Sequence, residues 1–290
     1  MTRVHVIGST FLTILVAVNA AMGQRSVPLG DNAALRYWAA FSQLQDAAIT
    51  DQEAKELNSA LNSMGPYDGS KYKNLIQKNA LALEIMARGT MLPVCDWGLD
   101  YGLGGDIPVD YAREGLVLGR LNVLYAMQLF HGGDKDEAIR TLAAGLRFSH
   151  DVANGGSLFA TLVAKELLMA YLTAVGDAAR MGQLSASERS LLHNAVVTLG
   201  DGLDWPSAAK RDLEALGSHN PGGAHSIQAL SRIESSYGAF LKDDSNLPGL
   251  MNAINQAPPE LARLIPNPKR VVEQKQELTE KLQQTRMLLQ

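Results

Sequence analysis

Apolar residues recur at helical spacing along nearly the whole chain, and no run alternates with the period of two that marks a half-buried strand. In residues 31–48, for example, Leu35, Trp38, Phe41 and Leu44 fall three apart and share one face of a helix. Asp31 stands where it can cap that helix, because its side chain can accept the free N–H groups of the first turn. The pattern predicts an all-α protein.

Capping residues and breaks set the bounds of the predicted helices. Thr50 with Glu53, and Ser185 with Glu188, have the spacing of a capping box, in which two side chains satisfy N–H groups of the first turn. Pairs of glycine, or of glycine and proline, end several of the helices because these residues rarely continue one. The predicted helices cover residues 31–48, 50–64, 70–88, 108–130, 134–152, 157–181, 185–199, 206–217, 226–241 and 269–290.

Residues 218–223 are rich in glycine, proline and asparagine, and the helices that follow are shorter and more polar. This change predicts a main helical domain over residues 24–217 and a C-terminal helical extension over residues 218–290. Because short breaks separate consecutive helices, we expect antiparallel helical hairpins joined by short turns.

The last predicted helix, residues 269–290, carries a narrow apolar stripe on an otherwise polar surface. The stripe consists of Val271, Leu278, Leu282 and Leu289. A stripe of this kind packs on the body of the same protein, or it binds a partner helix as the seam of a coiled coil does. The pattern leaves both interpretations open, and the second includes self-association through the C-terminal helix.

Residues 1–23 have the organisation of a cleaved export signal. Arg3 precedes an apolar core at residues 4–18, and the small residues Ala21 and Gly23 occupy the positions that a signal peptidase reads. The core has about 15 residues, short of the roughly 20 that a membrane-spanning helix needs. We therefore expect an exported protein, periplasmic or extracellular, with no membrane span after signal cleavage.

The charge and the cysteine content narrow the function classes. The net charge is −4 and no block of Lys and Arg stands out, which argues against nucleic acid as a partner, since such a partner requires clustered cations. Cys95 is the only cysteine of the chain, so no intramolecular disulfide can form. No histidine lies near it in sequence to lower the pKa of its thiol, and we interpret Cys95 as a small buried side chain.

The loop within residues 93–110 holds the densest mixture of recognition side chains. Asp96, Trp97, Asp100 and Tyr101 are the candidate binding residues, because aromatic faces stack on sugars or cations while carboxylates accept their hydrogen bonds. Their spacing lacks the order of a calcium loop, and we predict no metal site and no cofactor. The alternative is a structural loop in which the two aromatic rings fill the space between helices and the aspartates cap turns.

Residues 122–151 contain a helical hairpin with particular landmarks. Gly133 begins the turn, acidic residues follow it, Ala138 stands where two helices would cross, and Leu142 lies one turn later. This segment resembles one tetratricopeptide helix pair. The departures from that repeat are Ala126 in place of glycine, Leu129 in place of tyrosine, Gly145 in place of alanine and His150 in place of proline.

The resemblance implies a superhelix with a concave surface that binds protein or peptide without chemistry of its own. A non-repeating multi-helix bundle is the alternative fold, because any tight helical hairpin needs similar residues. We therefore favour an exported helical scaffold that binds a peptide, a protein or an envelope component through a groove or through the 93–110 loop. Whether the protein is an enzyme stays open, with binding preferred.

A second hypothesis comes from the histidines. His131, then His150 with Asp151, then Asp177 or Asp201 follow the order that resembles metal-dependent phosphohydrolases of the HD superfamily. That resemblance implies a hydrolase in a helical bundle, in which imidazoles and carboxylates converge on divalent ions that activate water. It is the alternative function.

One apolar helix contains charged residues where few are expected. The apolar run at residues 158–175 is interrupted by Lys165 and Glu166, which argues against a membrane span. Glu166 falls in the apolar sector of the helix, so it is a candidate buried acid. We expect a structural ion pair, with Arg113 or Arg120 as its partner, or a helix end that is exposed, more readily than a catalytic group.

Overall fold

The structure is a computed structural model that describes residues 29–45, 69–101, 109–180, 184–219 and 223–290. Every regular element in these ranges is a helix, which confirms the all-α fold class. The predicted export signal at residues 1–23 and the predicted helix at residues 50–64 lie outside the described residues.

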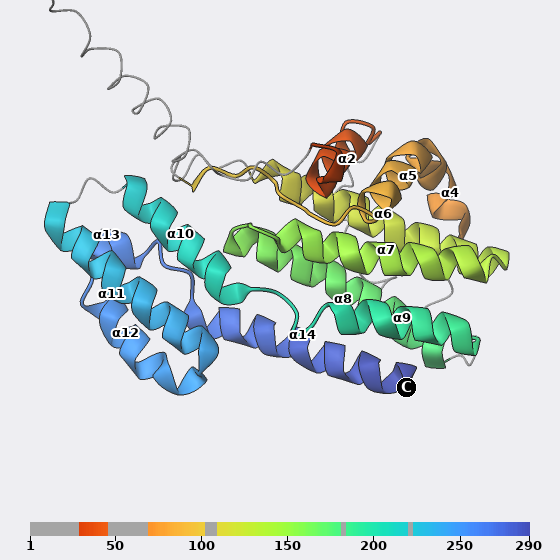
Figure 1. The fold of residues 1–290 in the computed structure, drawn as a ribbon. Coiled ribbons are helices and arrows are strands. Elements are labelled where there is room, and N and C mark those ends of the chain that lie inside the picture. The colour runs from red at the N-terminus through yellow and green to blue at the C-terminus, as the bar shows by residue number, and fades with distance from the viewer. Residues whose placement is uncertain (1–28, 46–68, 102–108, 181–183, 220–222) are drawn as a thin grey trace, which may run out of the picture.

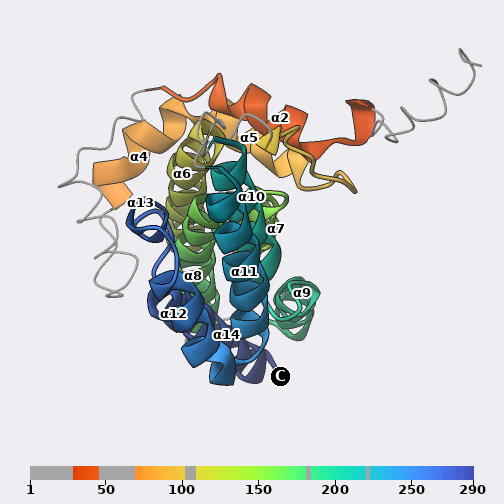
Figure 2. The same cartoon turned by 90° about the vertical axis from the view of Figure 1, so that its left-hand side faces the viewer.

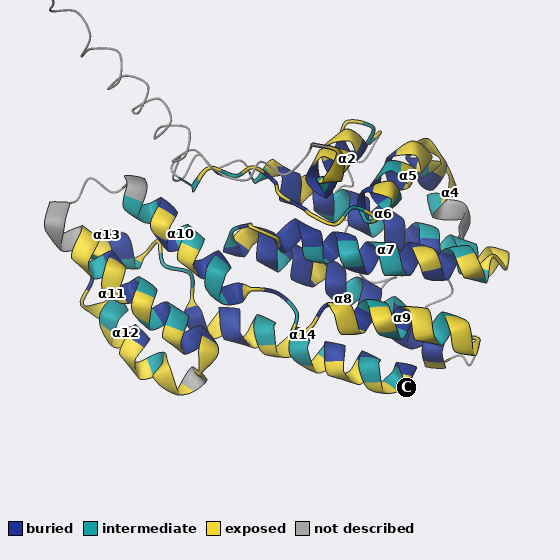
Figure 3. Ribbon diagram, in the orientation of Figure 1, coloured by how far each residue is buried: buried dark blue, intermediate teal, exposed yellow. Residues whose placement is uncertain are grey.

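Three long helices form the centre of the molecule: α6 (Asp110–Gly132), α7 (Lys135–Ala153) and α8 (Leu158–Arg180). Each contacts the other two, and their facing sides are buried (Figures 1 and 3). α8 has the length and composition of a membrane-spanning helix, but 61% of its most apolar window is buried inside the structure. Burial against other helices accounts for its apolar character.

The turn between α6 and α7 follows the sequence closely. Gly133 has a φ of 87°, in the left-handed region that glycine adopts without strain. Asp134 caps α7, because its carboxylate accepts the backbone N–H of Glu137 at 3.3 Å. The predicted hairpin is therefore present, with α6 and α7 packed side by side (Figure 1).

Other helices cover the central three on opposite sides. On one side lie α2 (Ala33–Phe41), α4 (Gly69–Lys78) and α5 (Ala80–Gly89), which contact α6 and α7 (Figures 1 and 2). On the other side, α9 (Ala186–Thr198) packs against α7, and α14 (Pro268–Leu289) packs along α8 and α9. The central helices are thereby shielded from both sides.

The remaining helices gather beyond one end of the central three (Figure 1). They are α10 (Trp205–His219), α11 (Gly223–Lys242), α12 (Leu247–Asn255) and α13 (Pro259–Ala262). A short 3-10 helix at Asp244–Asn246 joins α11 to α12, and another at Leu29–Asp31 precedes α2. α10 contacts α8, and α11 packs between α10 and α12. The chain then returns through α14 to the central helices.

Asn32 rather than the predicted Asp31 caps α2, because its side chain accepts the backbone N–H of Ala34 at 3.1 Å. Two further predicted bounds are wrong, and both lie where the Asn79 side chain makes its contacts. The helix predicted over residues 31–48 ends at Phe41, and the helix predicted over residues 70–88 divides into α4 and α5 at Asn79. The Asn79 amide accepts the backbone N–H of Gln45 at 2.8 Å and donates to the Gln45 carbonyl at 2.9 Å. The Asn79 amide therefore satisfies the backbone of Gln45 beyond the end of α2, at the point where α4 gives way to α5.

The apolar stripe of the C-terminal helix is buried within the same chain. Its members Val271, Leu278, Leu282 and Leu289 all belong to the core. They lie on α14, which packs against α8 and α9. The face that the sequence offered to a partner helix is therefore occupied by the body of the protein, while self-association of the chain stays a prediction.

The buried charge of α8 is the lysine rather than the glutamate. The Lys165 side chain is 5% exposed and the Glu166 side chain is 56% exposed, so the expectation of a buried Glu166 is wrong. Lys165 Nζ donates to Glu277 Oε2 of α14 at 2.6 Å and lies 3.6 Å from Glu166 Oε1. Glu277 therefore compensates the buried ammonium and ties α14 to α8.

Candidate functional site

Trp97 is buried in an aromatic cluster. Its ring centroid lies 4.4 Å from that of Tyr111, 5.8 Å from that of Tyr37 and 6.1 Å from that of Phe41. The indole Nε1 donates to the backbone carbonyl of Asp151 at 2.8 Å. The donor and much of the ring surface that a bound sugar or cation would use are therefore engaged inside the protein.

Two more of the predicted binding residues fasten the loop to its surroundings. Asp96 Oδ1 accepts the backbone N–H of Gly98 at 2.9 Å, and the Asn32 side chain binds both the N–H and the carbonyl of Asp96. Tyr101 Oη donates to the carbonyl of Gly155 at 2.7 Å. These contacts tie the loop to the start of α2 and to the connection between α7 and α8.

Asp100 is exposed beside this tethered segment. It completes the four residues that the sequence singled out, but Trp97 points into the core while Asp100 stays at the surface. The two cavities considered next are lined by other residues. Residues 102–108, which complete the predicted loop, lie outside the described residues.

A buried carboxylate lies beneath the loop. Asp151 is 2% exposed; its Oδ2 accepts the hydroxyl of Tyr37 at 2.7 Å and its Oδ1 accepts Arg147 Nε at 2.9 Å. Burial raises the pKa of Asp151, and the two hydrogen-bonded partners oppose that rise. Cys95 Sγ lies 3.7 Å from the Asp151 carbonyl, and burial raises the pKa of its thiol, which keeps this sulfur protonated.

The residues of the hydrolase hypothesis are spread along the bundle. His131 is exposed at the end of α6, next to the start of α7, whereas His150 lies in the last turn of α7. The helical rise places these two ends of α7 about 22 Å apart. Asp177 is paired with Arg180 at 2.6 Å. Within the described ranges, no group of three or more His, Cys, Asp or Glu side chains is placed to hold a metal ion.

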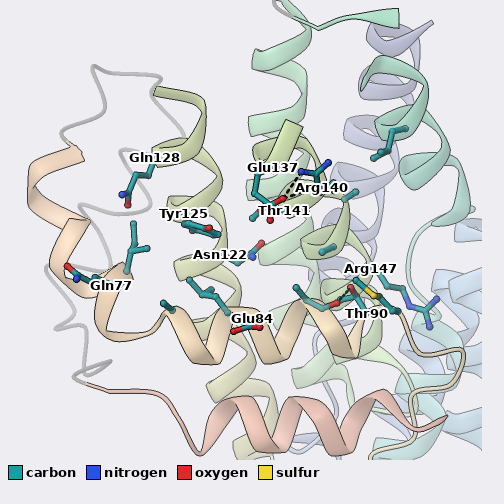
Figure 4. Close-up of a pocket in the computed structure, with 18 of the residues that line it drawn as sticks. Gln77, Glu84, Thr90, Asn122, Tyr125, Gln128, Glu137, Arg140, Thr141 and Arg147 are labelled. Carbon is teal, nitrogen blue, oxygen red and sulfur yellow. Dashed lines mark hydrogen bonds and ion pairs between the residues drawn. The ribbon is translucent and has the colours of Figure 1, made fainter. Parts of the chain in front are cut away.

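A groove of about 860 Å³ opens between α4 and α5 on one side and α6 and α7 on the other (Figure 4). Its apolar lining includes Ile76, Ala80 and Leu83 from α4 and α5, and Ala144 from α7. Leu191 of α9 lies at its outer edge and is 39% exposed. The groove therefore offers apolar surface that the described helices leave open.

Polar groups stand at intervals along the groove. Asn122 lies in its middle, and Tyr171 Oη bonds its Oδ1 at 2.8 Å from the buried side, so the rest of the amide faces the groove (Figure 4). Burial and the nearby Glu137 raise the pKa of Tyr125, which keeps its hydroxyl a donor. Gln128 stands toward one end of the groove, and Arg147 lies at the other beside Thr90 (Figure 4).

Arg147 also belongs to the wall of a second, smaller cavity of about 260 Å³. That cavity is lined by His150 and Thr198 among others, and burial lowers the pKa of His150. The same arginine thus separates the two hollows on this side of α7.

Sequence reasoning expected a groove but did not identify the residues that line this one. Glu137, Arg140, Ala144 and Arg147 recur at helical spacing on α7, as on any solvated helix face. They line a concave site only because α4 and α5 fold back beside them. No local sequence pattern predicts that α4 and α5 pack beside α6 and α7.

Comparison of the chain with protein-family models, curated proteins and solved structures gave no match in any of the three searches. The resemblance of residues 122–151 to a tetratricopeptide pair therefore rests on those residues. The function has to be argued from the geometry above.

Proposed function

We propose that this protein is an exported helical scaffold that binds a segment of a peptide or protein in the groove between α4–α5 and α6–α7. The observation that carries the proposal is the groove itself, whose volume of about 860 Å³ combines apolar walls with a few polar groups. Ligand sites in proteins commonly measure about 300–1,000 Å³ and have this mixed lining.

The dimensions of the groove favour a chain segment as its occupant. Glu137 and Arg147 lie ten residues apart on α7, which corresponds to about 15 Å along the helix. An extended polypeptide covers that length with about four or five residues. Such a segment supplies apolar side chains for the exposed Ala80 and Met91 and carbonyl groups for donors such as Tyr125.

The groove supports this function better than the 93–110 loop does. In the described part of that loop, Trp97, Asp96 and Tyr101 make contacts within the fold. The signal-like pattern of residues 1–23 supports export, where an envelope protein is a partner the chain would meet. No observation on the described residues favours the metal-dependent hydrolase.

The test is to fill the groove from either wall. Ala144→Trp on α7 and Ala80→Trp on α5 each place an indole in the cavity, and Ala39→Trp adds the same group to an exposed position of α2 outside it. Random peptides displayed on phage are selected against the full wild-type chain, and the enriched peptides are resynthesised. We expect both groove variants to weaken peptide binding by about tenfold or more, measured by fluorescence anisotropy, and Ala39→Trp to leave it unchanged.

Circular dichroism and thermal unfolding check that each variant keeps its fold. If the wild type enriches no peptides, or if folded Ala144→Trp and Ala80→Trp bind them as the wild type does, the groove is not the binding site and the proposal fails.

A further inference from the structure

Arg147 is held in place by a chain of buried hydrogen bonds. Its Nε donates to Asp151 Oδ1 at 2.9 Å, and the other oxygen of that carboxylate accepts the hydroxyl of Tyr37 at 2.7 Å. The Asp151 side chain is 2% exposed, whereas the Arg147 side chain is 37% exposed. The buried aspartate thus fixes an arginine that lines the end of the groove beside Thr90 (Figure 4).

The outer edge of this guanidinium remains open for binding. Only Nε of Arg147 is bonded to the described residues, which leaves the N–H groups of both Nη atoms for another acceptor. A planar guanidinium binds a carboxylate through two parallel hydrogen bonds. Because Asp151 and Tyr37 already hold the side chain, a ligand that uses it would lose little further side-chain entropy.

The charges of the groove point to an anionic group as well. Its cationic lining residues are Lys73, Arg140 and Arg147. Its acids each have an arginine beside them: Glu137 lies 2.8 Å from Arg140, and Glu84 is paired with Arg88. Lys73 forms no ion pair with the described residues, so the lining carries excess positive charge in a chain whose net charge is −4.

We infer that the groove takes a peptide segment that carries a carboxylate, and that Arg147 binds this carboxylate through its Nη groups. This inference rests on the function proposed above. Arg147 is then the specificity-determining residue, and Asp151 and Tyr37 are positioning residues. The carboxylate belongs to an Asp or Glu side chain of the segment or to its C-terminus, since both present the same two oxygens.

The test uses the peptides selected against the wild-type chain. Each is synthesised with its acidic residues intact, with Asp or Glu replaced by Asn or Gln, and with a free or an amidated C-terminus. We expect selection to enrich an acid at one position or a free C-terminus, and neutralising that group to weaken binding about tenfold or more. Which of the two changes has the effect identifies the source of the carboxylate.

Two forms of the protein assign the effect to Arg147. Arg147→Lys keeps the charge beside Asp151 but loses the planar fork, so the preference for the carboxylate should fall about fivefold or more. Because an unpaired buried Asp151 could unfold the chain, the second form is the double variant Arg147→Met with Asp151→Asn, which removes both charges. It should bind the acidic and neutral peptides alike.

Arg180→Lys is the matched control. Arg180 pairs with the largely buried Asp177 at 2.6 Å, as Arg147 pairs with Asp151, but it does not line the groove. The inference fails, and the proposed function stands, if Ala144→Trp weakens peptide binding but the peptides show no preference for a carboxylate. The same holds if the preference for a carboxylate persists in both Arg147 forms. A failure of the groove variants to weaken binding would overturn both.

Discussion

Two regions beside α7 use their residues in opposite ways. The closed end comprises the described loop residues 93–101, the α7–α8 connection and the part of α10 beside it. There, Trp97 and Tyr101 are engaged in internal hydrogen bonds. In the groove, ordinary side chains such as Ala144 and Arg147 leave apolar surface and N–H groups open. We therefore place the proposed binding site where the described residues leave hydrogen-bonding groups and apolar surface unused, and not where reactive residue types are concentrated.

α7 shows the same contrast within one helix. Gly145 and Phe148 are buried against neighbouring helices, whereas Arg140 and Ala144 line the groove. The buried face has to match its partners closely, because protein interiors are packed nearly as densely as organic crystals. The groove face has no such constraint, so substitutions there should act on binding and substitutions at the closed end on stability.

The largest expected effect is at Trp97. Trp97→Ala removes a buried indole from the cluster with Tyr37 and Tyr111 and should lower the free energy of unfolding by about 3–5 kcal/mol. Met91→Ala, at a residue of the groove that is 80% exposed, should change it by less than about 0.5 kcal/mol. Urea unfolding followed by circular dichroism measures both. Equal stability of the two variants would show that Trp97 contributes little to the core. The loop would then again be a candidate binding surface.

A smaller effect tests the buried face of α7. Gly145 lies within α7, and Gly→Ala within a helix normally gains up to about 1 kcal/mol. Here an added Cβ would lie well inside van der Waals contact with the ring of Tyr171, whose hydroxyl donates to the Gly119 carbonyl at 2.8 Å. Gly145→Ala should therefore destabilise the protein by about 2–3 kcal/mol.

The matched substitution is Gly238→Ala in α11, where an added Cβ meets no heavy atom within 4 Å. It should raise the free energy of unfolding by about 0.5–1 kcal/mol, measured in the same urea series. The opposite signs separate the effect of packing from that of helix propensity. A gain at both positions would mean that Tyr171 moves aside freely and that this face of α7 is not tightly packed.

Local signals predicted the helices well because their causes are local. The capping box at Ser185 and Glu188 is present with both of its hydrogen bonds, since the two residues need only each other and their own helix. The end of α2 at Phe41 was missed, and the segment that follows it is bound at Gln45 by the Asn79 amide, 34 residues from Gln45 in sequence. No pattern around Phe41 carries that information.

The candidate site divides in the same manner. The sequence drew attention to Trp97, but its role depends on a carbonyl of Asp151 that only the folded chain brings to the indole. In the sequence, Arg147 resembles any other surface cation. In the structure, the hydrogen bond from its Nε to the buried Asp151 fixes its position. The sequence shows the residue types, whereas tertiary contacts decide which hydrogen-bond partner each polar group has.

The last stability effect depends on pH and concerns the closed end. Asp212 Oδ2 accepts the backbone N–H of Leu158 at 3.1 Å, at the start of α8. Burial raises the pKa of Asp212 to about 6, although the Leu158 N–H and Arg211 oppose the rise. Between about pH 4 and pH 6 the folded chain therefore holds a proton that the unfolded chain has released. The contribution of this group to stability is greatest at low pH and is lost as the pH rises through 6.

Asp212→Asn keeps an oxygen for the Leu158 N–H and removes the titration. The variant should match the wild type near pH 4 and exceed its free energy of unfolding by about 2 kcal/mol above pH 6. Urea unfolding at a series of pH values measures the difference, with Asp243→Asn as a control because Asp243 is exposed and its pKa is lowered by Ser245. Peptide binding in the groove should be the same in Asp212→Asn and the wild type, because Asp212 lies outside the groove lining. A change in peptide binding would instead show that the groove and the closed end are energetically coupled, so the two regions would not be independent.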